Sequence, residues 1–357
     1  MSTTEAARAS AGGLRRTTLR PRWLIAGVAA VAGATVLGLT VGPVALSPTD
    51  VLAELFDQIP GVDVASGLSA IDSTIVLQLR LPRVVLGLLV GAMLSGAGAS
   101  YQGVFRNPLA DPYLLGVAAG AGLGATLAIV GGVGTADGLI DPVPLAAFAG
   151  ALVAVLGTYA VGVSRDRGTA ASTLILAGVA VASFLTAVQT YVQQQNSDSI
   201  RQVYSWILGR LGTAGWDEVV LLLPYAAVTT VVLLVNRRVL DVLGVGDEEA
   251  GSLGLDAARA RLVIVVAASL GTAAAVSVSG LIGFVGIIVP HAVRLLVGSS
   301  YRVILPLSML FGAAFLAMAD LVARTAAAPA EIPIGVITAF LGAPFFVLVL
   351  RSARRFA

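Results

Sequence analysis

Three places in this sequence hold ionisable side chains whose types and spacing could carry chemistry. They are the run of Asp247, Glu248 and Glu249, the pair Asp320 and Arg324, and the single histidine, His291. One histidine with no carboxylate close in sequence cannot build a multi-histidine metal site. We therefore expect a structural role for His291, at a helix end that follows the helix-breaking Pro290.

Two residue types that serve many enzymes are absent from the whole sequence. There is no cysteine, which excludes disulfides, zinc–thiolate sites and thiol catalysis. All 22 basic residues are arginines, whereas a P-loop needs the lysine of G-x-x-x-x-G-K-[ST] on its phosphates. Any work that ATP drives must therefore be energised by another polypeptide.

The pair Asp320 and Arg324 stands four residues apart on one face of an apolar helix. One interpretation is a local ion pair that satisfies both groups. The other is that Arg324 meets an acidic partner outside the chain. Ionisable residues are otherwise scarce in the apolar segments, although ion-coupled carriers need them along the path of the ion.

The elements that must position these residues lie in lipid. The chain has 357 residues, of which 57% are hydrophobic and 12% are charged. A soluble core of this size cannot hide so much apolar surface. The composition excludes a soluble enzyme, a disordered chain and a nucleic-acid binder. Residues 1–22 are small and polar, which predicts a disordered cytoplasmic tail, and residues 352–357 form a short second tail.

A helix that crosses a bilayer needs about 20 mostly apolar residues, and the sequence offers ten such segments. We expect an all-α polytopic membrane protein with a transmembrane domain over residues 23–351. The weakest separation, between the seventh and eighth segments, falls at residues 278–283. The segments are 23–46, 84–104, 113–133, 143–163, 174–191, 219–235, 262–279, 281–297, 303–323 and 333–350.

Small residues recur at four-residue spacing inside these segments, as at Gly87 and Gly91 and again at Gly116, Gly120 and Gly124. Such positions let helix backbones approach closely in lipid, so we expect tight helix packing there. Arginine-rich short loops stay in the cytoplasm, and 17 of the 22 arginines fall inside if both termini are cytoplasmic. We predict that orientation.

Four loops stand out from the ten segments. The outer loop at residues 47–79 is long and should hold a short helix around 51–58. RLPR at 80–83 and RNPLADP at 106–112 could be an interfacial anchor and an ordinary turn, or could be functional. The inner segment at 237–261 has about 25 residues, more than the 2–8 of a plain connector. We interpret it as a small folded platform, with a solvated linker as the alternative.

Six segments, taken in order, resemble the FecCD family of iron-chelate and cobalamin permeases of bacterial ABC importers. They are RLPRVVLGLLVGAMLSGAGASYQGVFRNPLADPYLLGVAAGAGLGA from Arg80, LILAGVA from Leu174, GDEEAGSLGL from Gly246, GLIGFVGIIVPHAVRLLVG from Gly280, LPLSMLFGAAFLAMADLVART from Leu305 and AEIPIGVITAFLGAPFF from Ala330.

The resemblance implies a multi-pass permease of the bacterial cytoplasmic membrane, working as a dimer around a central path. Two ABC ATPase subunits would dock from inside, and a substrate-binding lipoprotein would deliver cargo from outside. The cargo would be a ferric siderophore, with haem or cobalamin as alternatives. The permease itself would be no enzyme and would hold no cofactor, no metal and no nucleic acid.

The resemblance also assigns roles to positions of this sequence. The ATPase-coupling residues would be Asp247, Glu248, Glu249, Ala250, Leu253 and Gly254. The arginines that receive acidic residues of the binding protein would be Arg80, Arg83 and Arg324. The cytoplasmic gate would include Asn107, Leu109 and, weakly, Ser172 in an alanine-rich segment that departs from the family pattern.

Two other classes stay open from the sequence. An ion-coupled secondary transporter would work without an ATPase, and a channel would work without a binding protein. Whether the dimer pairs two copies of this chain or this chain with a paralogue is also open.

Overall fold

The computed structural model describes residues 19–133, 141–162, 171–212 and 215–353. All regular structure in these ranges is helical, which confirms the all-α prediction. Each of the ten predicted segments contains one apolar helix. These are α2 (Pro21–Thr40), α5 (Leu81–Val104), α6 (Val117–Val130), α7 (Pro142–Gly162), α8 (Ala171–Gln195), α10 (Trp216–Val235), α13 (Ala257–Ser279), α14 (Val285–Val297), α15 (Tyr301–Thr325) and α16 (Ile334–Ala353).

Seven of these helices, by length and composition, could cross a membrane, and α6, α14 and α16 are shorter apolar helices. The remaining elements are short. They are α3 (Pro48–Asp57), α4 (Ala70–Thr74), the π-helical η1 (Ile75–Arg80), the 3₁₀ turns η2 (Pro112–Leu115) and η4 (Ser197–Ser199), α9 (Ile200–Ile207), α11 (Arg237–Leu243) and α12 (Asp247–Ser252). The predicted outer helix is confirmed as α3, and it begins at Pro48 because proline suits the first helical position.

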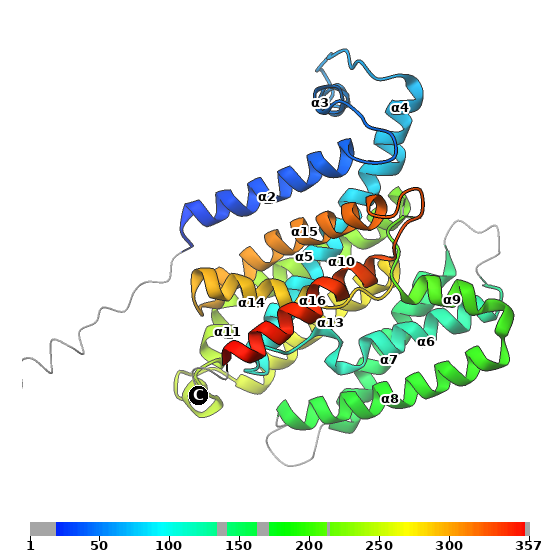
Figure 1. Cartoon of the computed structure of the whole chain (residues 1–357). Coiled ribbons are helices and arrows are strands. Elements are labelled where there is room, and N and C mark those ends of the chain that lie inside the picture. The colour runs from blue at the N-terminus through cyan, green and yellow to red at the C-terminus, as the bar shows by residue number, and fades with distance from the viewer. Residues whose placement is uncertain (1–18, 134–140, 163–170, 213–214, 354–357) are drawn as a thin grey trace, which may run out of the picture.

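Helix α5 lies at the centre of the molecule. It packs against α15, α13, α14 and α10, while α6, α7 and α8 form a neighbouring group that reaches the centre through α13 (Figure 1). Helix α2 packs on the outside of α15. Helices α8 and α7 turn large apolar side chains such as Phe184 and Leu156, each 68% exposed, away from the core. In a membrane protein such faces are suited to contact with lipid or with another transmembrane subunit.

The functional groups gather at two ends of the helix bundle. At the end marked by α3 and α4, which we call the outer end after the predicted orientation, α2 and α15 finish and α5 and α16 begin (Figure 1). At the opposite, inner end lie α11 and the finish of α16. The first and last apolar helices therefore begin and end on the same side, as an even number of crossings requires.

Glycines let α5 touch its neighbours backbone to backbone, as the spacing of small residues predicts at Gly91. A Cβ at Gly98 would overlap the carbonyl oxygen of Gly286 on α14, and one at Gly91 would overlap that of Gly312 on α15. These contacts leave no room for any side chain. They hold the central helices closer than larger residues would allow.

The expectation that His291 lies at a helix end is wrong. Helix α14 continues through Pro290 and His291 to Val297. Proline frees the carbonyl four residues earlier, which is that of Gly286, and the side-chain amide of Gln102 on α5 donates to this oxygen at 3.2 Å. The neighbouring helix thus replaces the missing bond, and the His291 ring packs edge-on to Phe345 with centroids 5.9 Å apart.

Other predictions fall partly outside the described residues. Of the predicted tail at 1–22, only residues 19–22 are described, and α2 already begins at Pro21. The tail at 352–357 is described only to residue 353. The separation predicted at 278–283 is confirmed, because α13 ends at Ser279 and α14 starts at Val285.

We expect Gly98→Ala to lower the thermal unfolding midpoint of the purified protein in detergent. The added methyl group has to displace backbone, and overpacking of this kind costs about 1–3 kcal/mol. Gly33→Ala on α2 is the matched control, since nothing lies within 4 Å of a Cβ there and alanine is the better helix former. Equal midpoints for the two variants would contradict the close contact.

Candidate functional site

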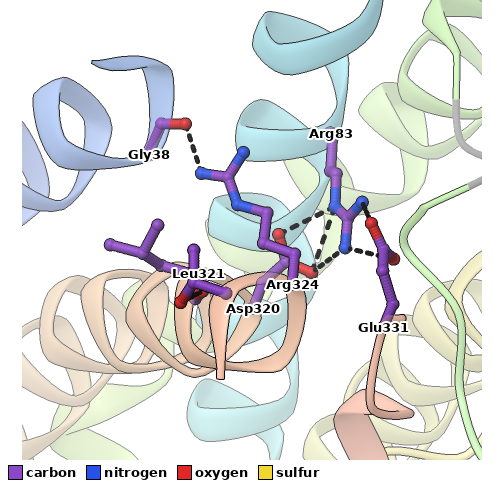
Figure 2. A network of polar contacts seen from close by, with 7 residues as sticks. Gly38, Arg83, Asp320, Leu321, Arg324 and Glu331 are labelled. Carbon is purple, nitrogen blue, oxygen red and sulfur yellow. Dashed lines mark hydrogen bonds and ion pairs between the residues drawn. The ribbon is translucent and has the colours of Figure 1, made fainter. Parts of the chain in front are cut away.

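Arg83, the third residue of α5, joins two carboxylates at the outer end. Its Nε and Nη2 each donate to Asp320 of α15 at 2.9 Å, and its Nη1 and Nη2 donate to Glu331 at 2.8 and 3.0 Å (Figure 2). Glu331 lies in the loop between α15 and α16. One guanidinium therefore ties α5, α15 and this loop together with two-pronged hydrogen bonds.

The two carboxylates differ in their exposure to solvent. The Asp320 side chain is 5% exposed, whereas that of Glu331 is 50% exposed. Hydrogen bonds from Arg83 hold the pKa of Glu331 below its usual value, against the smaller opposing effect of burial. Asp320 is thus the inner partner of Arg83, and Glu331 is the outer, accessible one.

The local ion pair between Asp320 and Arg324 is a wrong prediction. The carboxylate of Asp320 is taken by Arg83, and the Arg324 guanidinium turns toward α2, where it donates to the carbonyl oxygen of Gly38 (Figure 2). Spacing along one helix could not reveal this arrangement, because Arg83 stands 237 residues away from Asp320 in the sequence.

Arg80 also binds the end of α2. Its Nη1 donates to the carbonyl oxygens of Leu39 at 2.7 Å and Thr40 at 3.2 Å, and its Nη2 donates to that of Val44. Together with Arg324 it satisfies the free carbonyls of the last helical turn, where a cation is favourable. Arg80 is 6% and Arg324 is 5% exposed. Their docking role stays a prediction, and their partners in this structure lie within the chain.

A cavity of about 320 Å³ opens beside this polar cluster. Its charged lining comprises Arg83, Asp320, Glu331 and Arg210, and the last of these was not among the predicted site residues. The Arg210 guanidinium is 3.9 Å from Asp141, so it has only a distant ionic partner among the described residues. The one sequence signal for Arg210 was that few arginines lie on the predicted outer side and that Arg210 is one of them.

The predicted gate residues lie in a tight turn that follows α5. Arg106 adopts a left-handed conformation with φ of +50°, and the Asn107 side chain accepts a hydrogen bond from the Leu109 amide at 2.9 Å. Asp111 accepts one from the Tyr113 amide at 2.7 Å and so starts η2. Burial raises the pKa of Asp111 to about 6, opposed by that backbone hydrogen bond.

Asn107 and Leu109 are both half-buried in this turn, which we call the gate turn (residues 105–111). Their role in gating stays a prediction. Ser172 lies at the start of α8, and its side chain falls outside the described part of the chain.

The inner segment 237–261 forms two short helices, α11 and α12. Asp241 of α11 caps the start of α15: its carboxylate accepts hydrogen bonds from the Tyr301 amide at 2.5 Å and the Ser300 hydroxyl at 2.9 Å, and Arg302 Nε lies 3.3 Å away. A carboxylate at a helix N-terminus is favourable. Helix α11 is therefore fixed to the membrane domain.

Helix α12 contains four of the six predicted coupling residues, and the other two, Leu253 and Gly254, directly follow it. Ala250 is fully buried, whereas Glu248, Glu249 and Leu253 are exposed, the last at 71%. Gly254 follows with φ of +81°. Asp247 binds Arg261 at 2.9 and 3.0 Å and lies 3.5 Å from Arg106. One face of α12 is thus anchored, and an acidic and apolar face remains open.

The described residues contain no group of three or more histidine or carboxylate side chains that could hold a metal ion.

Three comparisons with known proteins each find that the chain is similar to transport proteins. The model of the FecCD transport family matches residues 29–352. The chain is 46% identical to the cobalamin import system permease protein BtuC of Halobacterium salinarum, over 80% of this chain and 76% of that protein. It is 34% identical to the Fe(3+)-citrate import system permease protein YfmE of Bacillus subtilis, over 90% and 92%.

A solved structure described as an inward-facing conformation of a metal-chelate type ABC transporter is also similar. It aligns with a TM-score of 0.80 and 27% identity, over 93% of this chain and all of that one.

We expect Asp320→Ala to destabilise the protein far more than Glu331→Ala. Removing one member of a buried pair costs about 3–5 kcal/mol, whereas a half-exposed pair contributes about 0–1 kcal/mol. The small effect of Glu331→Ala should vanish in acid, because a lowered carboxyl pKa gives stability that is lost as the pH falls through it. Thermal unfolding midpoints in detergent at pH 7 and at acidic pH measure both effects. An equal loss in the two variants at pH 7 would refute the ranking.

Proposed function

The chain belongs to the FecCD transport family, and from this premise we propose that it is the membrane permease of a binding-protein-dependent ABC importer for a metal chelate. The observation that carries the proposal is the open face of α12. It presents Glu248, Glu249 and the 71%-exposed Leu253 at the inner end. Exposed surface charges of this kind steer a partner protein and fix its register more than they add affinity.

The absence of lysine supports an external motor. The chain cannot hold a P-loop, so two ABC ATPase subunits would hydrolyse ATP and press on the α12 of each permease. In this proposal the functional unit is a dimer of permeases around one path, embedded in the cytoplasmic membrane with both termini inside. ATP binding and hydrolysis switch it between inward-facing and outward-facing states.

Of the three arginines predicted to receive a binding protein, Arg83 has the most open surroundings. It borders the 320 Å³ cavity, and its outer partner Glu331 is half-exposed. Acidic residues of a binding protein would compete there with Glu331 for Arg83, and fixed charges of this kind give register and fast association more than high affinity. Arg80 and Arg324 would support this surface by holding the end of α2.

For the cargo, the sequence favours a ferric siderophore, the expectation from family resemblance. Cobalamin is the second candidate, because the 46% identity is to a permease named for cobalamin import, while the Fe(3+)-citrate permease is 34% identical. Haem is a third, since a hemin transport permease of Yersinia pestis is 39% identical.

We expect the double substitution Glu248→Arg and Glu249→Arg to reduce both cargo uptake and the stimulation of the partner ATPase. The substitutions reverse the charge of the open α12 face without touching its anchored face. The measurements are ATP hydrolysis and cargo uptake in vesicles that hold the whole complex. Asp63→Arg, an exposed acidic residue near the outer end, serves as the control and should leave ATPase stimulation unchanged. Full stimulation with the double variant would count against the coupling surface.

The same vesicles separate the alternative classes. An ABC importer should take up cargo only with ATP, its ATPase and its binding protein. Uptake that persists without nucleotide and stops with an uncoupler would instead indicate an ion-coupled carrier. Presenting a ferric siderophore, haem and cobalamin in turn to the binding protein would identify the cargo.

A further inference from the structure

Asp247 differs from the other acidic residues of α12 in the direction of its contacts. As the first residue of that helix, it binds two arginines from other parts of the chain, Arg261 and Arg106. Among the described residues, Glu248 and Glu249 have no ion pair within 4 Å, and both are exposed. The acidic run therefore consists of one residue bound to the rest of the chain and two exposed residues.

The contact with Arg261 is the firm one. Both oxygens of Asp247 accept from Arg261 Nη2, at 2.9 and 3.0 Å, and the Arg261 side chain is only 12% exposed. Arg261 lies in the first turns of α13, which packs directly on α5 at the centre of the molecule. Through this contact, α12 is joined to the transmembrane core.

The contact with Arg106 is the loose one. Its Nη2 lies 3.5 Å from the same carboxylate, and the two side chains are 45% and 47% exposed. Exposed pairs of this kind contribute about 0–1 kcal/mol, so this contact can tighten or part as α12 moves without disturbing the fold. Yet Arg106 immediately precedes Asn107, and its backbone at φ of +50° begins the gate turn.

The second carboxylate of the platform provides the contrast. Asp241 is 22% exposed and has three partners, all at the start of α15. It fixes α11 to one helix end and reaches no part of the gate turn. Asp247 is the described carboxylate that touches α13 and the gate turn at once.

We propose, resting on the proposed function, that Asp247 is a positioning residue that transmits movement of α12 to the gate turn through Arg106, while Arg261 keeps α12 joined to α13. Glu248, Glu249 and Leu253 would meet the ATPase. Asp247 would face the opposite way, into the permease. It would link the ATPase-binding face of α12 to the gate turn.

The test uses the whole complex in vesicles and measures cargo moved per ATP hydrolysed. We expect Asp247→Asn to lower this ratio by up to about fivefold, the effect that the upper limit for an exposed ion pair would give. Asp247→Glu, which keeps the charge, should recover most of it. Arg106→Gln should lower the ratio as Asp247→Asn does, although it leaves the Asp247–Arg261 pair intact.

The matched control is Glu248→Gln on the same helix, which should reduce ATP hydrolysis and uptake together and so leave the ratio near that of the wild type. If Asp247→Asn also reduced both in proportion, Asp247 would belong to the ATPase contact surface and the inference would be wrong. A normal ratio in Arg106→Gln would likewise overturn it. Thermal midpoints of each variant show whether a loss reflects unfolding, and Arg106→Gln, on an exposed side chain, keeps the test decisive if Asp247→Asn fails to fold.

The wild type separates this inference from the function on which it rests. Absence of ATP-driven uptake in the wild-type complex would defeat the proposed function itself. Normal wild-type uptake with unaltered ratios in the variants would defeat only the role of Asp247.

Discussion

Hydrocarbon supplies no hydrogen-bonding partner, so every polar group that enters it must find one within the protein. This constraint explains the internal polar contacts of the chain. Several serine and threonine side chains inside the helices donate their hydroxyl groups to the carbonyl four residues earlier, as Ser100 and Thr126 do. Where Pro290 breaks that pattern, an amide from the next helix fills the gap. Burying a charge without a partner costs more than burying a neutral polar group. The paired charged groups described above lie at the two ends of the helix bundle.

The two ends of the bundle satisfy their polar groups with opposite charges. At the outer end, buried arginines bind the carbonyl oxygens that finish α2, and a two-pronged pair with Asp320 fixes Arg83. At the inner end, carboxylates from the platform bind a helix start and two arginines. At both ends a buried contact stands next to a half-exposed one. The buried contact sets the geometry, and the exposed one is where a partner protein could change it.

Composition and periodicity were sufficient to predict the ten apolar helices, because each must be long and apolar to exist in lipid. They missed α9, whose eight residues are too short and too amphipathic to stand out. They also offered a local pair of Asp320 with Arg324 as one of two interpretations, since only neighbours along one helix are visible in a sequence. The true partner of Asp320 is brought to it by the packing of α5 on α15. Family resemblance pointed to the acidic run at 247–249, but not to the opposite directions in which its members face.

The glycine contacts of α5 have a mechanical consequence. Where two helices meet through bare backbone, there is no layer of side chains that can shear or repack, and interdigitated main chains resist sliding. Helices α5, α14 and α15 should therefore travel as one rigid body. A change of access across the membrane would then come from rotation of this block against the other helices. Helix α2 would move with the block, because Arg80 and Arg324 bind carbonyl oxygens at its end.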